Sequence, residues 1–218
     1  MTRLAFIHTG AVVIPEFERL AAEYLPEASI QHLLDSTIVS DLRSGSAPED
    51  IRTRLTHLAA TAKAAGAQSV MFTCSSISGF ATEVAAEAAI EVLRVDETMA
   101  DDAVATASRA VVVATLPTTL APTVALLNER ASASAREVEI VEALVDGAFD
   151  AVASGDKTTH DRLVGEEIVK QASNADVIVL AQASMASAAS AVSVDVPVLT
   201  SPERGVQRLA ESLLPAEI

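Results

Sequence analysis

The sequence predicts an α/β protein made of two similar lobes, each with a parallel sheet. Short apolar strands alternate with helices along the 218 residues, and this alternation is typical of parallel strands joined by crossover helices. The apolar run at 110–114 is typical of a parallel strand that is buried on both faces. A weak internal repeat is the third observation, because Cys74 and Gln182 each follow an apolar strand and precede a helix rich in Ala and Ser.

The composition limits both the core and the partners. Hydrophobic residues make up 50% of the chain and aromatic residues 3%, so the core must be built from Ala, Val, Leu and Ile. The formal net charge of −15 argues against a nucleic acid partner, which needs a basic face. The excess of acidic residues instead indicates a well-solvated surface.

Cysteine usage and hydropathy indicate the compartment. The single cysteine excludes an internal disulfide and a cysteine-rich metal site, which suits a reducing environment. The apolar run at 4–7 is too short for a signal peptide, and no stretch reaches the ~18 uninterrupted apolar residues of a membrane span. We therefore expect a cytoplasmic protein without a membrane partner.

Strands are expected where short apolar or β-branched runs end in polar or turn-forming residues. The run at 4–7 ends at His8-Thr9-Gly10, and the run at 70–72 ends at a cluster of small polar residues. The strands are expected at 4–7, 30–34, 70–72, 92–95, 110–114, 137–141, 177–180 and 197–199.

Helices are expected where apolar residues recur at helical spacing. The clearest start has Ser46 as N-cap, Pro48 in the first turn and Glu49 three residues after the serine, and Gly66 ends this helix. Asp96 is expected to cap another helix, and the segment 35–45 is expected to be irregular. The helices are expected at 15–25, 46–66, 80–89, 97–108, 120–134, 143–153, 159–173 and from 202 onward.

The repeat predicts the domain organisation. Gln182 follows Cys74 by 108 positions, which is close to half of the chain, and each turn is followed by a short strand and a capped helix. We expect two flavodoxin-like lobes that face each other across a cleft, the first at 1–98 and the second at 99–204. A C-terminal helix at 205–218 is expected to return to the first lobe, and no linker marks the boundary.

Cys74 stands where a strand ends and a helix begins. The first N–H groups of such a helix point back at the thiol, and the positive end of the helix favours the thiolate. An ordinary thiol titrates near ~8.5, so a modest lowering of the pKa gives an appreciable thiolate fraction at neutral pH. The alternative is a small apolar cysteine that is buried for packing alone.

Other polar residues also follow strands, which is where ligands bind in open α/β sheets. Thr9 is either a ligand contact or an ordinary turn residue, and His8 is either a proton carrier or a structural residue. Ser75, Ser76 and the threonines at 115, 118 and 119 are either helix caps or anion-binding groups, two roles that are compatible. The remaining histidines, His32, His57 and His160, are expected to face solvent. No metal-ligand spacing and no glycine-rich phosphate loop is present in the sequence.

Three short motifs carry a family resemblance. The segment 71–76 (MFTCSS) resembles the first cysteine motif of the aspartate/glutamate/hydantoin racemase superfamily, and 177–185 (VIVLAQASM) resembles its second motif. The segment 114–119 (ATLPTT) resembles the threonine-bearing loop after the first strand of the second lobe. The resemblance covers nearly the whole chain.

The resemblance implies an active site between two pseudo-symmetric lobes, with no cofactor and no metal. Two cysteines flank the α-carbon of a small carboxylate substrate, and one takes a proton that the other replaces on the opposite face. It also implies a homo-oligomer, with a dimer as the expected form. By this resemblance the catalytic positions are Cys74, the thiol that acts as base or nucleophile, and Gln182. The substrate-binding residues are expected to be Thr9, Thr73, Ser75, Ser76, Thr115, Thr118, Thr119, Ala183 and Ser184.

The chain departs from the family pattern at Gln182, which stands where the second cysteine belongs. An amide donates and accepts hydrogen bonds but does not transfer a proton as a thiol does. The sequence thus predicts a cofactor-independent isomerase or racemase that acts next to the carboxylate of a small amino acid or (di)carboxylic acid with one cysteine. The superfamily also includes maleate isomerases and arylmalonate decarboxylases. The alternatives are a decarboxylase of malonate-type acids and a non-catalytic carboxylate-binding protein.

Overall fold

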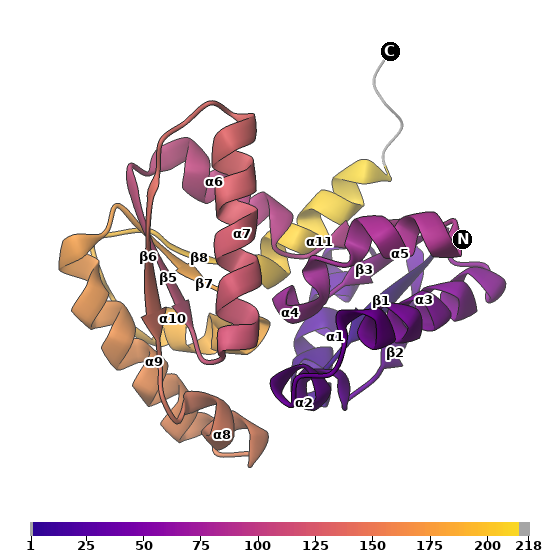
Figure 1. The fold of residues 1–218 in the computed structure, drawn as a ribbon, viewed down its shortest axis with the longest axis horizontal. Helices are drawn as coiled ribbons and strands as arrows, with labels where there is room; N and C mark the ends of the chain where they lie inside the picture. The colour runs from indigo at the N-terminus through magenta and orange to yellow at the C-terminus, as the bar shows by residue number, and fades with distance from the viewer. Residues whose placement is uncertain (1, 214–218) are drawn as a thin grey trace. The chain divides into compact units, whose positions relative to one another are not determined.

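The computed structural model describes residues 2–213, which fold into two compact units (Figure 1). The first unit comprises the described residues up to Val95 together with those from Pro202 on, and the second runs from Asp96 to Ser201. Each unit holds one four-stranded, fully parallel sheet, so the predicted α/β class is confirmed. Positions 214–218 of the helix expected at 205–218 lie outside the described residues.

The first sheet has the strand order β2-β1-β3-β4. Its central strands β1 and β3 are buried because helices cover both faces, which explains their unbroken apolar runs. The strands are β1 (Thr2–His8), β2 (Ala28–Leu34), β3 (Ser69–Phe72) and β4 (Glu91–Arg94).

Successive side chains of β1 point to opposite faces of this sheet. Ala5 and Ile7 lie in one core cluster with Leu55 of α3 and Val84 of α5. On the other face Phe6 packs edge-on against Phe17 of α1, with ring centroids 5.8 Å apart. The helices of the first unit are η1 (Ala11–Val13), α1 (Ile14–Tyr24), α2 (Ile38–Arg43), α3 (Pro48–Ala64), α4 (Ser75–Ser78), α5 (Ala81–Ala88) and α11 (Ser201–Ser212).

The second sheet repeats this topology, with the order β6-β5-β7-β8. One face of β5 packs under α6 and α7, and the other packs under α8, α9 and α10. The strands are β5 (Arg109–Ala114), β6 (Glu139–Leu144), β7 (Val177–Leu180) and β8 (Val198–Thr200). The helices are α6 (Glu97–Thr106), α7 (Pro117–Ala133), α8 (Ala148–Ala153), α9 (Lys157–Gln171), η2 (Ala172–Asn174), η3 (Ala183–Met185) and α10 (Ala186–Ala191).

The two units exchange one helix each. Helix α6 follows β4 of the first sheet but belongs to the second unit, and α11 follows β8 of the second sheet but belongs from Pro202 on to the first. Helix α11 approaches its own unit closely, because a Cβ built on Gly205 would lie 2.6 Å from the carbonyl oxygen of Val95. The chain therefore passes between the units without any linker segment.

One predicted helix cap is wrong, and another is confirmed in its position only. The N-cap of α3 is Ala47 rather than Ser46, and Pro48 at the first helical position sets the start instead. Asp96 does occupy the N-cap of α6, but its carboxylate makes no capping hydrogen bond. Gly66 ends α3 as predicted, with a φ of 90° that suits glycine.

Two segments have a different secondary structure from the one expected. The segment 35–45 is not irregular, because Ile38 is fully buried and α2 forms around it, behind a turn in which Asp35 accepts a hydrogen bond from the Thr37 N–H. Residues 143–147 are not helical. There β6 runs on to Leu144, and the Val145 N–H still bonds to the Ala114 carbonyl, 2.8 Å away.

Candidate functional site

Cys74 lies at the carboxyl end of β3 in the first unit. The Thr73 N–H extends the strand ladder to the Ile7 carbonyl at 3.1 Å. Cys74 follows with extended backbone angles (φ −136°, ψ 124°), and its carbonyl accepts from the Ile77 N–H at 3.1 Å. The thiol residue is partly exposed. The helix expected at 80–89 is preceded by the short helix α4, which begins directly after the cysteine.

The other candidates of this unit lie at the same edge of the sheet. Thr9 follows β1, and β1 is the direct neighbour of β3. Thr9, Thr73, Ser75 and Ser76 are all buried, whereas Cys74 is partly exposed. Cys74 is therefore the more accessible residue among its hydroxyl-bearing sequence neighbours.

Gln182 has the same backbone environment in the second unit. The Ala181 N–H bonds to the Val113 carbonyl at 3.0 Å, as the Thr73 N–H does to Ile7. Gln182 is also extended (φ −131°, ψ 137°), and its carbonyl accepts from the Met185 N–H at 3.0 Å. Cys74 and Gln182 are thus equivalent positions of the repeat.

The Gln182 amide is oriented by Thr115. Its Oε1 accepts from the Thr115 N–H at 2.6 Å and from the Thr115 hydroxyl at 2.8 Å. A backbone N–H can only donate, so the amide oxygen must be the atom on this side. The NH₂ group therefore points away from Thr115 and is available to donate hydrogen bonds to an acceptor.

Thr118 and Thr119 lie in the first turn of α7, whose N-cap is Leu116. The N-cap residue Leu116 has no polar side chain, so neither Thr118 nor Thr119 is the N-cap residue of this helix. The Thr118 hydroxyl is buried and has no hydrogen-bond partner among residues 2–213. Ala183 and Ser184 lie in η3, half-buried, directly after Gln182. This edge therefore offers hydroxyl, amide and helix N-terminal donors, which suit an anion.

Two histidines expected to face solvent do not. His160 is fully buried, and His32 is half-buried with its Nδ1 2.9 Å from Nε2 of the fully buried His8. Only His57 of the three is exposed. The predicted strand at 30–34 could have placed His32, because its partner in the parallel ladder is the buried Phe6 and paired residues point to the same face.

A polar cluster on α9 and α10 was not predicted. Asp161 Oδ1 accepts from the Ser187 hydroxyl at 3.0 Å and lies 2.8 Å from His160 Nδ1, and Lys157 pairs with Asp161 and Ser187. Burial raises the pKa of Asp161, but its hydrogen bonds to Lys157, His160 and Ser187 outweigh burial and lower it. The cluster ties α9 to α10, the helix that follows the Gln182 turn.

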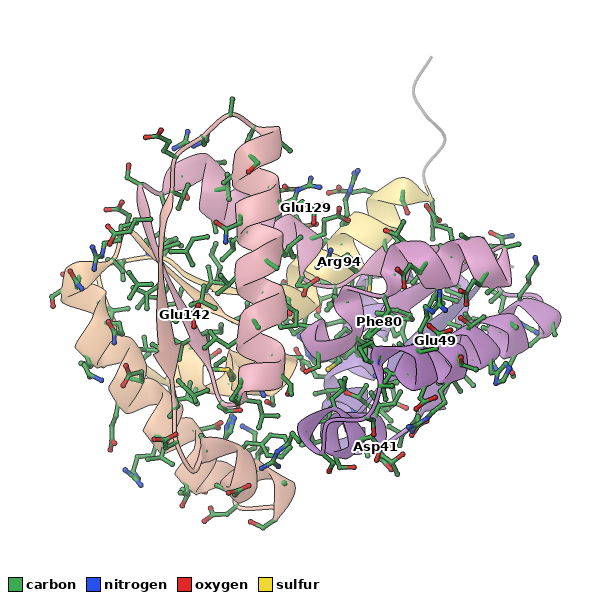
Figure 2. The ribbon with its side chains drawn as sticks, in the orientation of Figure 1. Asp41, Glu49, Phe80, Arg94, Glu129 and Glu142 are labelled. Atoms are coloured by element: carbon green, nitrogen blue, oxygen red, sulfur yellow. The ribbon has the colours of Figure 1, made fainter. Side chains whose placement is uncertain are left out.

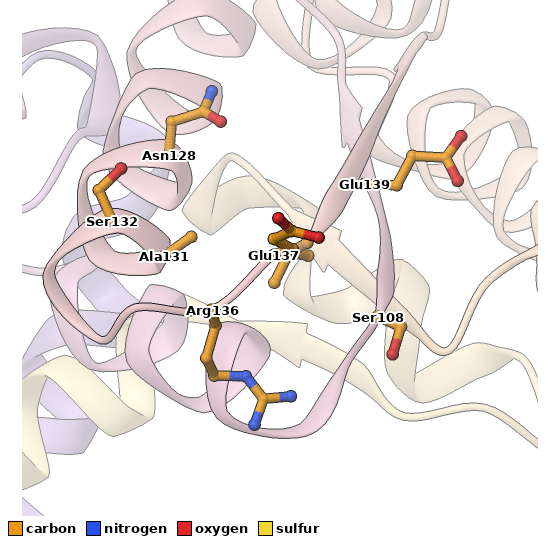
Figure 3. A pocket seen from close by; sticks show the side chains of 8 residues that line it. Ser108, Asn128, Ala131, Ser132, Arg136, Glu137 and Glu139 are labelled. Atoms are coloured by element: carbon orange, nitrogen blue, oxygen red, sulfur yellow. The ribbon is translucent and has the colours of Figure 1, made fainter.

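A separate open pocket of about 480 Å³ lies at the amino ends of the second sheet (Figure 3). Ser108 and Glu139 stand before and at the start of strands, so this pocket is at the opposite edge from Gln182. Its lining residues are Ser108, Asn128, Ala131, Ser132, Arg136, Glu137, Val138 and Glu139, none of which was predicted to be functional.

Within residues 2–213 no three His, Cys, Asp or Glu side chains come together as metal ligands. No helix in that range is both long and apolar enough to cross a membrane.

The chain belongs to the Asp/Glu/hydantoin racemase family, whose model matches residues 7–209. The family assignment made from the cysteine motifs is therefore confirmed. None of the curated proteins matches the chain by sequence.

Solved structures share the fold at low sequence identity. A putative Asp/Glu racemase from Yersinia pestis has a TM-score of 0.74 at 15% identity, over 97% of this chain and 99% of its own. A glutamate racemase isoform from Bacillus anthracis has a TM-score of 0.75 at 14% identity, over 97% and 81%. An arylmalonate decarboxylase has a TM-score of 0.58 at 14% identity, over 99% and 95%. These likenesses support the two-sheet α/β fold.

Proposed function

We propose that the protein is a cofactor-independent racemase or isomerase that acts at the carbon next to the carboxylate of a small amino acid or (di)carboxylic acid, with Cys74 as its one thiol. The Cys74 thiolate takes the α-proton: the C–H bond breaks, an S–H bond forms, and the electron pair passes into the carboxylate. The thiol then returns a proton to carbon. Hydrogen-bond donors that are already in place stabilise the charge that develops on the carboxylate oxygens.

One observation supports this proposal: Cys74 and Gln182, whose motifs resemble the family's two cysteine motifs, follow equivalent strands with the same backbone turn, and the amide oxygen of Gln182 is already bound. Thr115 holds Gln182 Oε1, so the NH₂ group of Gln182 is left to bind a substrate carboxylate. Thr118, with its partnerless hydroxyl in the first turn of α7, is the second donor proposed for that carboxylate. A glutamine amide does not transfer a proton as a thiol does, so the thiol moves protons on one face of the α-carbon. The configuration therefore inverts only where the intermediate turns over in the site before it is reprotonated.

The test follows hydrogen exchange in heavy water by NMR, with a panel of small amino acids and dicarboxylic acids. We expect the wild type to replace the α-hydrogen of at least one acid by deuterium. Cys74→Ala should lower the rate by ~10²–10⁴-fold, which is the usual contribution of a positioned base. Ser132→Ala, which removes an exposed hydroxyl near the end of α7, serves as the control. Equal exchange in the wild type and in Cys74→Ala would remove Cys74 as the base.

A decarboxylase is the second candidate, favoured by the presence of a single thiol and by the likeness to an arylmalonate decarboxylase. Cys74 would then act as an acid that protonates the carbanion left when a malonate-type acid loses carbon dioxide. Release of carbon dioxide from such acids, without deuterium uptake into the substrate, would select this reaction. Thermal stabilisation by a carboxylate without turnover would instead indicate a binding protein.

A further inference from the structure

His8 links two strands through both of its ring nitrogens. It is the last residue of β1, and its side chain is fully buried. Its Nδ1 lies 2.8 Å from the Thr73 hydroxyl, and its Nε2 lies 2.9 Å from Nδ1 of His32 on β2. The two imidazole rings are within 10° of parallel. A chain of hydrogen bonds therefore runs from the half-buried His32 to the residue directly before Cys74.

The surroundings of this chain are aromatic. The His8 ring centroid is 5.7 Å from that of Phe17 on α1, and the His32 centroid is 5.7 Å from that of Phe6 on β1. Burial, and to a lesser extent the neighbouring His32, lowers the pKa of His8 to about 4. Burial also lowers the pKa of His32, against a smaller opposing effect of Glu18 on α1. Both rings are therefore neutral at pH 7.

The available hydrogens decide which atom donates in each hydrogen bond between His32, His8 and Thr73. The Thr73 hydroxyl donates to the Ile7 carbonyl at 3.0 Å, so its oxygen is left to accept from His8 Nδ1–H. A neutral His8 then has a bare Nε2, which accepts from His32 Nδ1–H. Each donor has one acceptor, and bonds that point the same way polarise one another.

The internal repeat shows that the fold does not require this chain of hydrogen bonds. The register of the second sheet puts Ala114 at the position of His8 and Ala181 at that of Thr73. Glu142, labelled in Figure 2, takes the position of His32 and is exposed. The same backbone turn forms at Gln182 without the two imidazoles and the hydroxyl group. The chain of hydrogen bonds therefore serves something that only the Cys74 turn needs.

We propose that His32 and His8 are positioning residues of the Cys74 turn, and that they act by holding the Thr73 side chain against the Ile7 carbonyl. Two donors of Thr73, its N–H and its hydroxyl, then bond to one carbonyl oxygen at 3.1 and 3.0 Å. These two hydrogen bonds to one oxygen fix where β3 ends and the direction in which the backbone continues to Cys74. The effect of these histidines on catalysis rests on the proposed function, whereas the chain of hydrogen bonds is tested without substrate.

The first measurement is ¹⁵N NMR of the histidine rings of the full chain at pH 7. We expect His8 and His32 both as Nδ1–H tautomers. Thr73→Val should shift the His8 Nδ1 resonance because its acceptor is lost, and Thr73→Ser should restore it. An Nε2–H tautomer of His8 in the wild type would overturn the proposal.

The second measurement is hydrogen exchange at the Thr73 amide. His8→Phe and His32→Phe keep an aromatic ring but remove the nitrogens, and each should speed this exchange about five- to tenfold, while the other β3 amides stay within about twofold. His57→Phe, which replaces the exposed histidine of α3, should change nothing. Unchanged exchange at Thr73 in both ring variants would also overturn the proposal.

The deuterium-exchange assay then separates positioning from the proposed function. His32→Phe should lower kcat about tenfold and leave KM within about twofold, because a displaced thiol acts on the reacting step. A change in KM alone would contradict positioning. If the wild type turns over no acid, the proposed function fails, and the Thr73 amide still decides whether the histidines hold the turn.

Discussion

Gln182 and Cys74 differ in what their side chains can do with a proton. Both residues are extended, and both accept a hydrogen bond from the N–H three residues further on. The backbone therefore offers the same starting direction for either side chain. What differs is the partner: Thr115 bonds to the Gln182 amide oxygen twice, so that the amide presents donors only. We therefore predict that Gln182 transfers no proton and that protons move on the Cys74 face alone.

The substitution Gln182→Cys tests this directly. A thiol at this position should add proton transfer on the second face and raise racemisation of simple α-substituted acids by ~10²–10⁴-fold from near background. The readout is the loss of optical activity together with deuterium uptake. Because Thr115 loses its acceptor, we also expect the free energy of unfolding to fall by about 1–2 kcal/mol.

Gln182→Ser is the matched control for that variant. It removes the same amide but supplies no thiol, so it should show the loss of stability without the gain in racemisation. Efficient exchange on both faces by the wild type would contradict the one-thiol scheme.

Helix α11 shows how one residue fixes the packing of an element. Gly205 faces the chain at Val95, where a Cβ would lie 2.6 Å from the carbonyl oxygen and 2.8 Å from Cγ2. A backbone oxygen cannot rotate away, so either the helix or the strand end must shift. An alanine inside a helix is otherwise stabilising, by about 1 kcal/mol over glycine.

We therefore expect Gly205→Ala to destabilise the protein by about 1–3 kcal/mol despite the better helix propensity. Urea unfolding measures this difference. Gly79→Ala is the control, because Gly79 has helical angles (φ −62°, ψ −19°) and nothing within 4 Å of its Cβ position, so it should be neutral or slightly stabilising. A Gly205→Ala protein as stable as the wild type would show that α11 is not packed against Val95.

The elements also show what local sequence can predict. Buried strands such as β7 were predicted residue for residue, since a four-residue apolar run between polar residues has few other uses. The end of the edge strand β6 was predicted too early, because its mixture of exposed, half-buried and buried residues (EIVEAL) is equally typical of the start of a helix. The ladder bond from the Val145 N–H to the Ala114 carbonyl decides that choice, and it lies outside any local window.

At the scale of the whole molecule, the repeat was the most informative signal. Matching turns at Cys74 and Gln182 predicted two like sheets, and the two sheets have the same strand order. Bounds at 1–98 and 99–204, with a C-terminal helix that returns to the first lobe, were also expected from the sequence, and the two units divide at Val95 and Pro202. The His8–His32 hydrogen-bond chain was not predicted, because its partners are 24 residues apart and only the parallel register of β1 and β2 joins them.

The stability of the whole molecule should depend on pH through these histidines. The pKa of His8 is lowered from 6.5 to about 4, so the unfolded chain binds protons more readily than the folded one between these values. Stability is therefore complete above pH ~6.5 and is lost as the pH falls toward 4. The pKa of Asp35 and that of Asp161 are lowered too, but carboxyl groups act below their ordinary values near ~4.

We expect the free energy of unfolding to fall by about 2–3 kcal/mol between pH 6.5 and 4.5 through the buried histidine pair. The net charge of −15 works against this loss, because acidification toward the pI of 4.5 relieves repulsion between carboxylates. His8→Phe removes the first effect and keeps the second, so its stability should stay level or rise over the same window. Urea unfolding of both proteins at four pH values, with His57→Phe as control, gives the comparison. Parallel curves for the wild type and His8→Phe would mean that the buried imidazole takes up its proton as easily as an exposed one, against its burial among Phe6, Phe17 and His32.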